Sequence, residues 1–180
     1  GTNRNSDEYF SYVIKAARTR GVESSTLVVA PSFQEVSSTD DELFWTAGDW
    51  REGGDGITNT GIRVSSFTAL DAIIVALSSR QRFPSIEKIV VTGHSAGGQV
   101  VQRYAAGSQI DPGTPTIRYV PANPSSYMYL NELRYVSDEF TSSGDLFSAC
   151  SHYNDYKYGL DARGTVPYMA AQTDNALRSK

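Results

Sequence analysis

The stretch that decides the fold is Val91-Thr92-Gly93-His94-Ser95-Ala96-Gly97-Gly98. A run of β-forming residues, Ile89-Val90-Val91, leads into it, and residues 99–106 form a helical run after it. This strand–turn–helix order is the context of the Gly-x-Ser-x-Gly nucleophile elbow, in which a serine hydroxyl stands at a strained turn. The motif glycines let strand and helix approach closely. We therefore predict that Ser95 is a nucleophile and that the backbone N–H of Ala96 faces a developing oxyanion.

A simpler interpretation is that Ser95 is only a helix N-cap, a position at which serine is favoured. A cap accounts neither for the paired glycines nor for the apolar strand in front of them. The flanking pattern therefore favours the elbow.

The composition is typical of one globular domain. The chain has 180 residues, of which 39% are hydrophobic and 20% are charged. The net charge is −4 and no basic cluster is present, which argues against a nucleic-acid partner. No apolar run approaches the roughly 20 residues that cross a bilayer, so no membrane partner is expected. No metal-ligand spacing and no phosphate-binding glycine loop occurs, so no metal and no cofactor is predicted.

Strands and helices are expected to alternate, which predicts a parallel α/β layer structure. The expected strands are residues 26–30, 88–92 and 117–121. A first helix is expected after Asn5, with Glu8 placed as in a capping box. Ser65 or Ser66 is expected to cap a second helix, and Pro167 to begin a last helix over residues 167–177.

The long segment 32–61 reads as a loop and contains both tryptophans, Trp45 and Trp50. A loop of this length in a compact domain is usually functional or disordered, and two tryptophans argue against disorder. Trp45 and Trp50 either line a substrate pocket, together with His94, or hold the loop against the core.

A serine hydroxyl needs a base, and the chain has two histidines, His94 and His152. The side chain beside the nucleophile of an elbow points away from it, so His94 is a poor candidate. His152 is the internal candidate for the base, with Asp138, Asp145 or Asp155 as its acid. The alternative is that His152 is a loop residue at the rim of the site.

The sequence resembles the α/β-hydrolase superfamily and, more narrowly, the uncharacterised secreted-type hydrolases of fungi, related eukaryotes and bacteria. The similarity extends over nearly the whole chain. The segments that carry it are Gly1-Thr2-Asn3-Arg4-Asn5, Ala30-Pro31-Ser32-Phe33, Leu43-Phe44-Trp45 with Gly48-Asp49-Trp50, His94 to Gly98, Ala122 to Tyr127, and Tyr153 to Leu160.

The resemblance implies a three-layer α/β-hydrolase-type parallel sheet with helices on both faces. Residues 1–180 are expected to be the central part of a single domain, with the first and last strands of the sheet absent. A missing strand would leave the edges of strands 26–30 and 88–92 unpaired. By the same resemblance, Gly1 belongs to a turn that makes the N–H of Thr2 a second oxyanion donor, and the acid and the base lie outside these residues.

The resulting functional hypothesis is a secreted serine esterase that cleaves carboxylic esters through an acyl-enzyme on Ser95. The chain is expected to be either a partial reading frame or one piece of a cut protein, inactive by itself. In the second case its partners are the remaining pieces of the hydrolase, and Cys150, the only cysteine, could bridge to one of them. The alternative is a non-catalytic binding module that keeps the elbow as scaffold.

Overall fold

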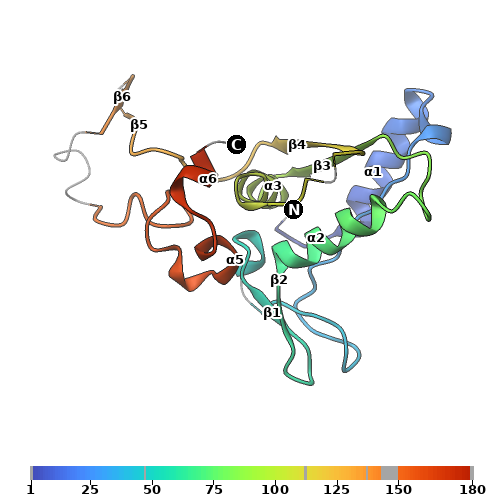
Figure 1. Cartoon of the computed structure of the whole chain (residues 1–180), viewed down its shortest axis with the longest axis horizontal. Coiled ribbons are helices and arrows are strands. Elements are labelled where there is room, and N and C mark those ends of the chain that lie inside the picture. The colour runs from blue at the N-terminus through green and yellow to red at the C-terminus, as the bar shows by residue number, and fades with distance from the viewer. Residues whose placement is uncertain (1, 47, 112, 137, 143–149, 179–180) are drawn as a thin grey trace.

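The centre of the computed structural model is a strand–helix–strand unit (Figure 1). The structure describes residues 2–46, 48–111, 113–136, 138–142 and 150–178. In the unit, β3 (Lys88–His94) leads into α3 (Ala96–Gly107), which leads to β4 (Thr116–Ala122). The two strands pair in parallel along their whole length. The strands expected over residues 88–92 and 117–121 are therefore confirmed, each slightly longer than predicted.

The face of this sheet that packs on α3 is more buried than the opposite face. Ile89 is 8% exposed, whereas Val90 is 50% exposed and Val120 is 48% exposed. In the described part of the chain β3 has one neighbouring strand, β4, so its other edge is unpaired. Parallel sheets are normally covered on both faces. Among the described residues this sheet therefore has an unpaired edge at β3 and an exposed face on the side away from α3.

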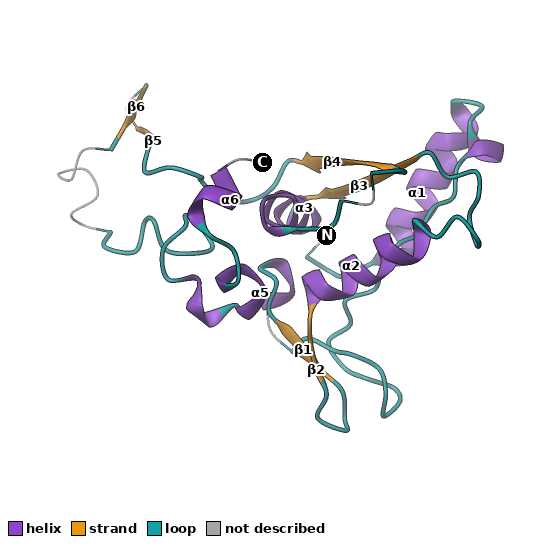
Figure 2. Cartoon of the chain, in the orientation of Figure 1, coloured by secondary structure: helices purple, strands orange, loops and turns teal. Residues whose placement is uncertain are grey.

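The other elements are short apart from two helices (Figure 2). Serine at position 65 accepts a hydrogen bond from the N–H of Phe67, so Ser65 is the cap of the second helix. The helices are α1 (Ser6–Thr19), α2 (Ser66–Leu77), α5 (Pro167–Ala170) and α6 (Asp174–Arg178), the 3-10 helices are Glu23–Ser25, Gly48–Arg51 and Arg163–Thr165, and the remaining strands are β1 (Asp55–Ile57), β2 (Arg63–Ser65), β5 (Arg134–Val136) and β6 (Glu139–Thr141).

The core forms where α3 meets α2 and the C-terminal helices (Figure 1). Tyr104 of α3 and Phe67 of α2 are fully buried, with ring centroids 5.5 Å apart. Phe67 also packs edge-on against Tyr168 of α5 at 5.4 Å. Met169 and Leu177 complete this cluster and are fully buried as well. The packing of its apolar face therefore holds α3, the helix that follows Ser95, in place.

Three expectations about local structure are wrong. Residues 26–30 are extended but pair with no described strand, because backbone groups form a ladder only against a neighbour. Asn5 makes no side-chain cap bond; its amide binds the carboxylate of Glu8 instead. The single last helix that was expected is two short helices, α5 and α6, because the residues between Ala170 and Asp174 are not helical.

The described elements are mixed helices and three two-stranded sheets, β1–β2, β3–β4 and β5–β6. A three-layer sheet of the hydrolase type therefore stays a prediction. The described residues contain one parallel strand pair, β3–β4, joined by a packed helix.

A half-buried polar cluster joins α2, α3 and α5. Asp71 of α2 accepts hydrogen bonds from the hydroxyls of Tyr104, at 2.6 Å, and Tyr168, at 3.1 Å. Burial, and secondly the carboxylate of Asp71, raises the pKa of Tyr104 well above its ordinary value. The same two causes raise the pKa of Tyr168.

These raised pKa values predict alkaline destabilisation. An unfolded tyrosine ionises near pH 10, whereas Tyr104 and Tyr168 stay neutral in the folded chain above that pH. Their contribution to stability is therefore fully present below about pH 10 and is lost as the pH rises further. We expect the urea midpoint to fall between about pH 10 and pH 11, with a smaller slope in the Tyr104→Phe/Tyr168→Phe double variant. An equal slope in both proteins would contradict this assignment.

Candidate functional site

The backbone at Ser95 turns sharply between β3 and α3. Its φ is 56° and its ψ is −117°, a conformation that costs a residue with a side chain about 1–3 kcal/mol. Ser95 occupies the N-cap position, yet its side chain makes no cap hydrogen bond. Its hydroxyl oxygen instead lies 3.3 Å from that of Ser125, in the loop after β4. The hydroxyl thus stands at the carboxyl end of the parallel strands, the end at which open α/β sheets bind ligands.

Two glycines make this turn possible by close backbone contact. A Cβ on Gly93 would lie 2.5 Å from the carbonyl group of Gly97, and a Cβ on Gly98 would lie 2.6 Å from the carbonyl oxygen of Ala122. A Cβ on Gly97 would meet nothing within 4 Å. Gly97, the second glycine of the motif, thus contributes its backbone to the contact with Gly93. Gly98 is the residue that, like Gly93, has no room for a side chain.

This difference predicts opposite effects for two alanine substitutions in the motif. Gly93→Ala forces strand and helix apart and is expected to cost about 1–3 kcal/mol of unfolding free energy. Gly97→Ala, in open space within the first turn of α3, is expected to be neutral or to stabilise by up to about 1 kcal/mol. Urea denaturation of both variants measures the two effects. Equal destabilisation by both would show that the close approach of Gly93 to α3 is not present.

The N–H groups of the first turn of α3 form the candidate oxyanion site. Ala96 is 1% exposed, and its N–H donates to no acceptor in the described part of the chain. The amides at a helix start carry partial positive charge, which favours an anion there. Thr2 lies in an exposed turn ahead of α1 and makes no described contact with Ser95 or Ala96. Gly1 lies outside the described residues, so the second donor stays a prediction.

Neither described histidine reaches Ser95. The Nδ1 atom of His94 lies 3.0 Å from the hydroxyl of Tyr9 on α1. The Nδ1 atom of His152 lies 2.7 Å from the carboxylate of Asp155, and the His152 side chain is 82% exposed. Asp155 is therefore the acidic partner of His152, as one of the alternatives proposed, but the pair is not joined to the nucleophile.

Of the two other acid candidates, Asp138 is among the described residues. Asp138 lies in the turn between β5 and β6 and accepts a hydrogen bond from Tyr135 at 3.4 Å. Asp145 lies outside the described residues. A triad within the described chain is thus not assembled.

The loop that brings Ser125 to Ser95 is held on α3 by two side chains. Arg103, which is fully buried, donates to the hydroxyl of Ser126 at 2.9 Å and to the carbonyl of Arg51 at 3.1 Å. Gln102 donates to the carbonyl of Met128 and accepts from its N–H, at 2.7 and 2.9 Å. Sequence reasoning missed these contacts. The available signal was that Arg103 is the one charged residue in the helical run of residues 99–106.

Both tryptophans are buried, Trp45 to 3% and Trp50 to 6% exposure. Phe33 stacks on Trp50 and packs edge-on against Trp45, each at 5.2 Å. Arg4 reinforces the cluster by donating to the carbonyls of Phe33 and Trp45. This packing supports the interpretation that the tryptophans hold the loop against the core.

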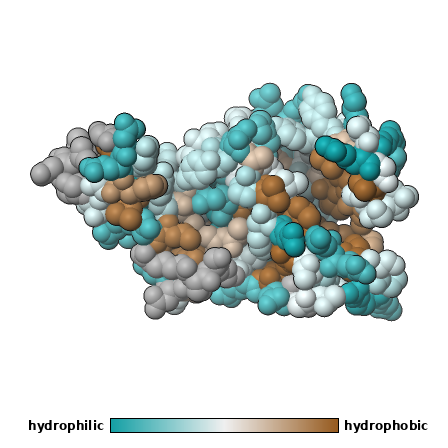
Figure 3. Space-filling model, turned by 90° about the horizontal axis from the view of Figure 1, so that it is seen from above, coloured by the Kyte–Doolittle hydropathy of each residue, from teal (hydrophilic) through white to brown (hydrophobic). Residues whose placement is uncertain are grey.

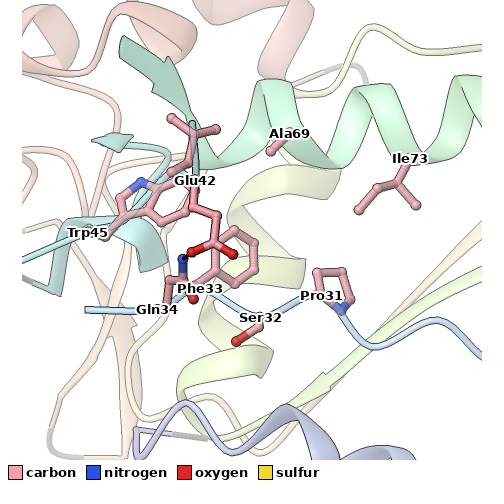
Figure 4. A pocket seen from close by; sticks show the side chains of 9 residues that line it. Pro31, Ser32, Phe33, Gln34, Glu42, Trp45, Ala69 and Ile73 are labelled. Carbon is pink, nitrogen blue, oxygen red and sulfur yellow. Dashed lines mark hydrogen bonds between the residues drawn. The ribbon is translucent and has the colours of Figure 1, made fainter. Parts of the chain in front are cut away.

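Trp45 also lines a cavity of about 350 Å³ beneath α2, shown in Figure 4. Ala69 and Ile73 of α2 form one wall and Pro31 and Phe33 form the other. Neither Ser95 nor His94 is among its lining residues, and Trp50 is absent from them too. A substrate-binding role for Trp45, Trp50 and His94 therefore gains no support from contact with the nucleophile.

Further observations concern Cys150, metal ligands and membrane-spanning helices. Cys150 is exposed and forms no disulfide in the described structure, so its bridge stays a prediction. The described residues include no cluster of three metal-ligating side chains and no helix long and apolar enough to span a bilayer.

A comparison with known proteins finds no matching family model, no matching curated protein and no matching solved structure.

Proposed function

We propose that the protein is a serine hydrolase that cleaves carboxylic esters through an acyl-enzyme on Ser95. On the resemblance, the base and the acid come from residues outside these 180, and in the described structure neither His94 nor His152 is hydrogen-bonded to Ser95. The resemblance of the sequence supports membership of the α/β-hydrolase class as part of this proposal. On that resemblance alone we also propose that it is secreted and that other pieces of the hydrolase are its partners.

One observation carries the proposal, namely the conformation of Ser95. A serine that served only as a cap would direct its hydroxyl to the N–H groups of α3. Ser95 occupies the cap position in a strained conformation and turns its hydroxyl to Ser125 instead. Backbone strain of this kind persists where the surrounding structure imposes it, and such sites are often functional.

The chemistry follows from this arrangement. The Ser95 oxygen attacks the ester carbonyl carbon while its proton passes to the base, and the carbonyl oxygen becomes an oxyanion beside the N–H of Ala96. Collapse of the tetrahedral species expels the alcohol, which takes up the proton, and leaves the acyl group on Ser95. Water then attacks the acyl group with the same base and releases the acid. Removal of one oxyanion donor typically costs about 10²–10³ in rate.

The proposal is tested with this chain by supplying the missing base. A short-chain fluorophosphonate reacts with an activated serine: the serine oxygen bonds to phosphorus, fluoride leaves and the proton passes to the base. Free imidazole is expected to accelerate labelling by about tenfold or more, because general bases contribute about 10²–10⁴ to such steps. Mass spectrometry of the peptides is expected to place the adduct on Ser95. An adduct elsewhere, or none with imidazole present, would refute the nucleophile.

The absence of a described base also favours a second candidate, a non-catalytic hydrolase-fold binding module. The two candidates differ in what imidazole does. A module that keeps the elbow only as scaffold is expected to show no labelling at Ser95 that depends on imidazole. A hydrolase site that lacks only its base is expected to show a rate of Ser95 labelling that rises in proportion to the concentration of neutral imidazole.

A further inference from the structure

The loop after β4 brings one hydroxyl, that of Ser125, to the turn that carries Ser95. The two hydroxyl oxygens lie 3.3 Å apart. Within the described ranges of the chain, neither hydroxyl makes another hydrogen bond. Ser125 is exposed and Ser95 is half-buried, so the pair lies where a substrate can approach from solvent. The hydroxyl of Ser125 is therefore able to donate its hydrogen bond to the Ser95 oxygen.

The backbone of this loop touches the elbow at two places. The N–H of Ser95 donates to the carbonyl of Ala122, the last residue of β4, at 3.0 Å. A Cβ on Gly98 would lie 2.6 Å from the same carbonyl oxygen, so the glycine lets the loop approach α3 closely. Asn123, with a φ of 43°, then turns the chain out of the strand. The start of the loop that carries Ser125 is therefore set by contacts with both ends of the elbow.

Two side chains of α3 hold the loop on the far side of Ser125. Arg103 donates to the hydroxyl of Ser126 at 2.9 Å, and Gln102 binds both backbone groups of Met128, at 2.7 and 2.9 Å. Beyond Met128 the chain runs to the β5–β6 hairpin, over which Figure 3 shows apolar atoms at the left of the view. The hydrogen bonds to α3 lie between Ser125 and this hairpin. The position of Ser125 therefore depends on α3, the helix that follows Ser95.

We propose that Ser125 is a positioning residue that donates a hydrogen bond to the Ser95 oxygen as that oxygen gives up its proton. The inference rests on the proposed function for the reaction in which this bond is used. The proton of Ser95 passes to the base, while Ser125 keeps its own proton and shares it in the hydrogen bond. A hydrogen bond to the charged form of a group favours that form. The same bond keeps the Ser95 hydroxyl away from the N–H groups of α3, to which a capping serine would turn.

A thiol at position 95 tests this bond without the missing base. Ser95→Cys is made together with Cys150→Ser, which removes the chain's own exposed thiol. The pH dependence of alkylation by iodoacetamide gives the pKa of the new thiol. We expect Ser125→Ala to raise that pKa by about 0.7 and Ser125→Thr, which keeps a hydroxyl, to leave it within about 0.2. His94 is unchanged in all these proteins, so its charge contributes equally. Equal thiol pKa values with serine and with alanine at position 125 would overturn the proposal.

A double-mutant cycle separates the hydroxyl from the general shape of the loop. Gln102→Met removes both hydrogen bonds to Met128 and is expected to raise the thiol pKa, because Ser125 is then less firmly placed. In the Ser125→Ala background the same substitution is expected to change the thiol pKa by less than about 0.2, because the hydroxyl that it displaces is already gone. Equal shifts in both backgrounds would show that α3 acts on position 95 without Ser125, which contradicts the proposal. Urea denaturation checks that each protein compared is folded.

Labelling of the serine itself gives the second measurement. With imidazole present, Ser125→Ala is expected to slow fluorophosphonate labelling of Ser95 by about fivefold, and Ser125→Thr to restore it to within about twofold. The matched control is Ser11→Ala, which removes an exposed serine hydroxyl with one hydrogen bond on α1 and is expected to leave the rate within about twofold. A shift of the thiol pKa without any labelling of Ser95 would refute the proposed function alone. Labelling of Ser95 that Ser125→Ala leaves unchanged would refute the role of Ser125 alone.

Discussion

Replacement of Ser95 by alanine is expected to reduce imidazole-dependent fluorophosphonate labelling by at least about 10³-fold, to the background of unactivated serines. The effect is the largest expected for this chain because the Ser95 oxygen is the atom that forms the new bond. Its neighbours only position it or stabilise charge. Rates of labelling, followed by intact-protein mass spectrometry, measure the loss.

The adjacent hydroxyl provides the matched control. Ser125→Ala removes the one described side-chain hydrogen bond of Ser95 but leaves the oxygen and the turn in place. We expect its labelling to remain within about tenfold of the starting protein, since a single hydrogen bond contributes about 1 kcal/mol. Labelling that survives in Ser95→Ala and disappears in Ser125→Ala would show that Ser125 is the reactive serine.

Replacement of Arg103 by methionine is expected to lower the free energy of unfolding by about 3 kcal/mol, because one buried and two half-buried acceptors lose their donor. Burial also lowers the pKa of Arg103, which records the cost of placing its charge there. The guanidinium offsets that cost by bonds to the carbonyl of Arg51, the side chain of Gln99 and the hydroxyl of Ser126. Chemical denaturation measures the loss.

The same substitution at an exposed arginine isolates the effect of burial. Arg118 lies on the uncovered face of β4 and is exposed. Arg118→Met is expected to change the unfolding free energy by no more than about 0.5 kcal/mol. If the two variants were equally stable, Arg103 would not be the side chain that holds the Ser125 loop on α3.

The unit around Ser95 could be predicted because its pattern is local. A β-forming run, two glycines at a turn and a helical run occupy about 20 consecutive residues, and each favours its own structure without distant contacts. The strand over residues 26–30 could not be predicted correctly in the same way. Its apolar composition favours a strand, but a strand requires a neighbour, and neighbours are long-range contacts.

The sequence by itself determined the strands β3 and β4, the helix between them and the sharp turn at Ser95. Only the tertiary structure decided that Gly98 is tight where Gly97 is open, that Ser125 meets Ser95, and that Arg103 and Gln102 hold the loop between them. Turns and helices follow from backbone preferences within a few residues. The partner of a hydroxyl such as that of Ser95, or of a buried guanidinium such as that of Arg103, depends on which distant segments the fold brings within hydrogen-bonding distance, and residue order along the chain does not specify that.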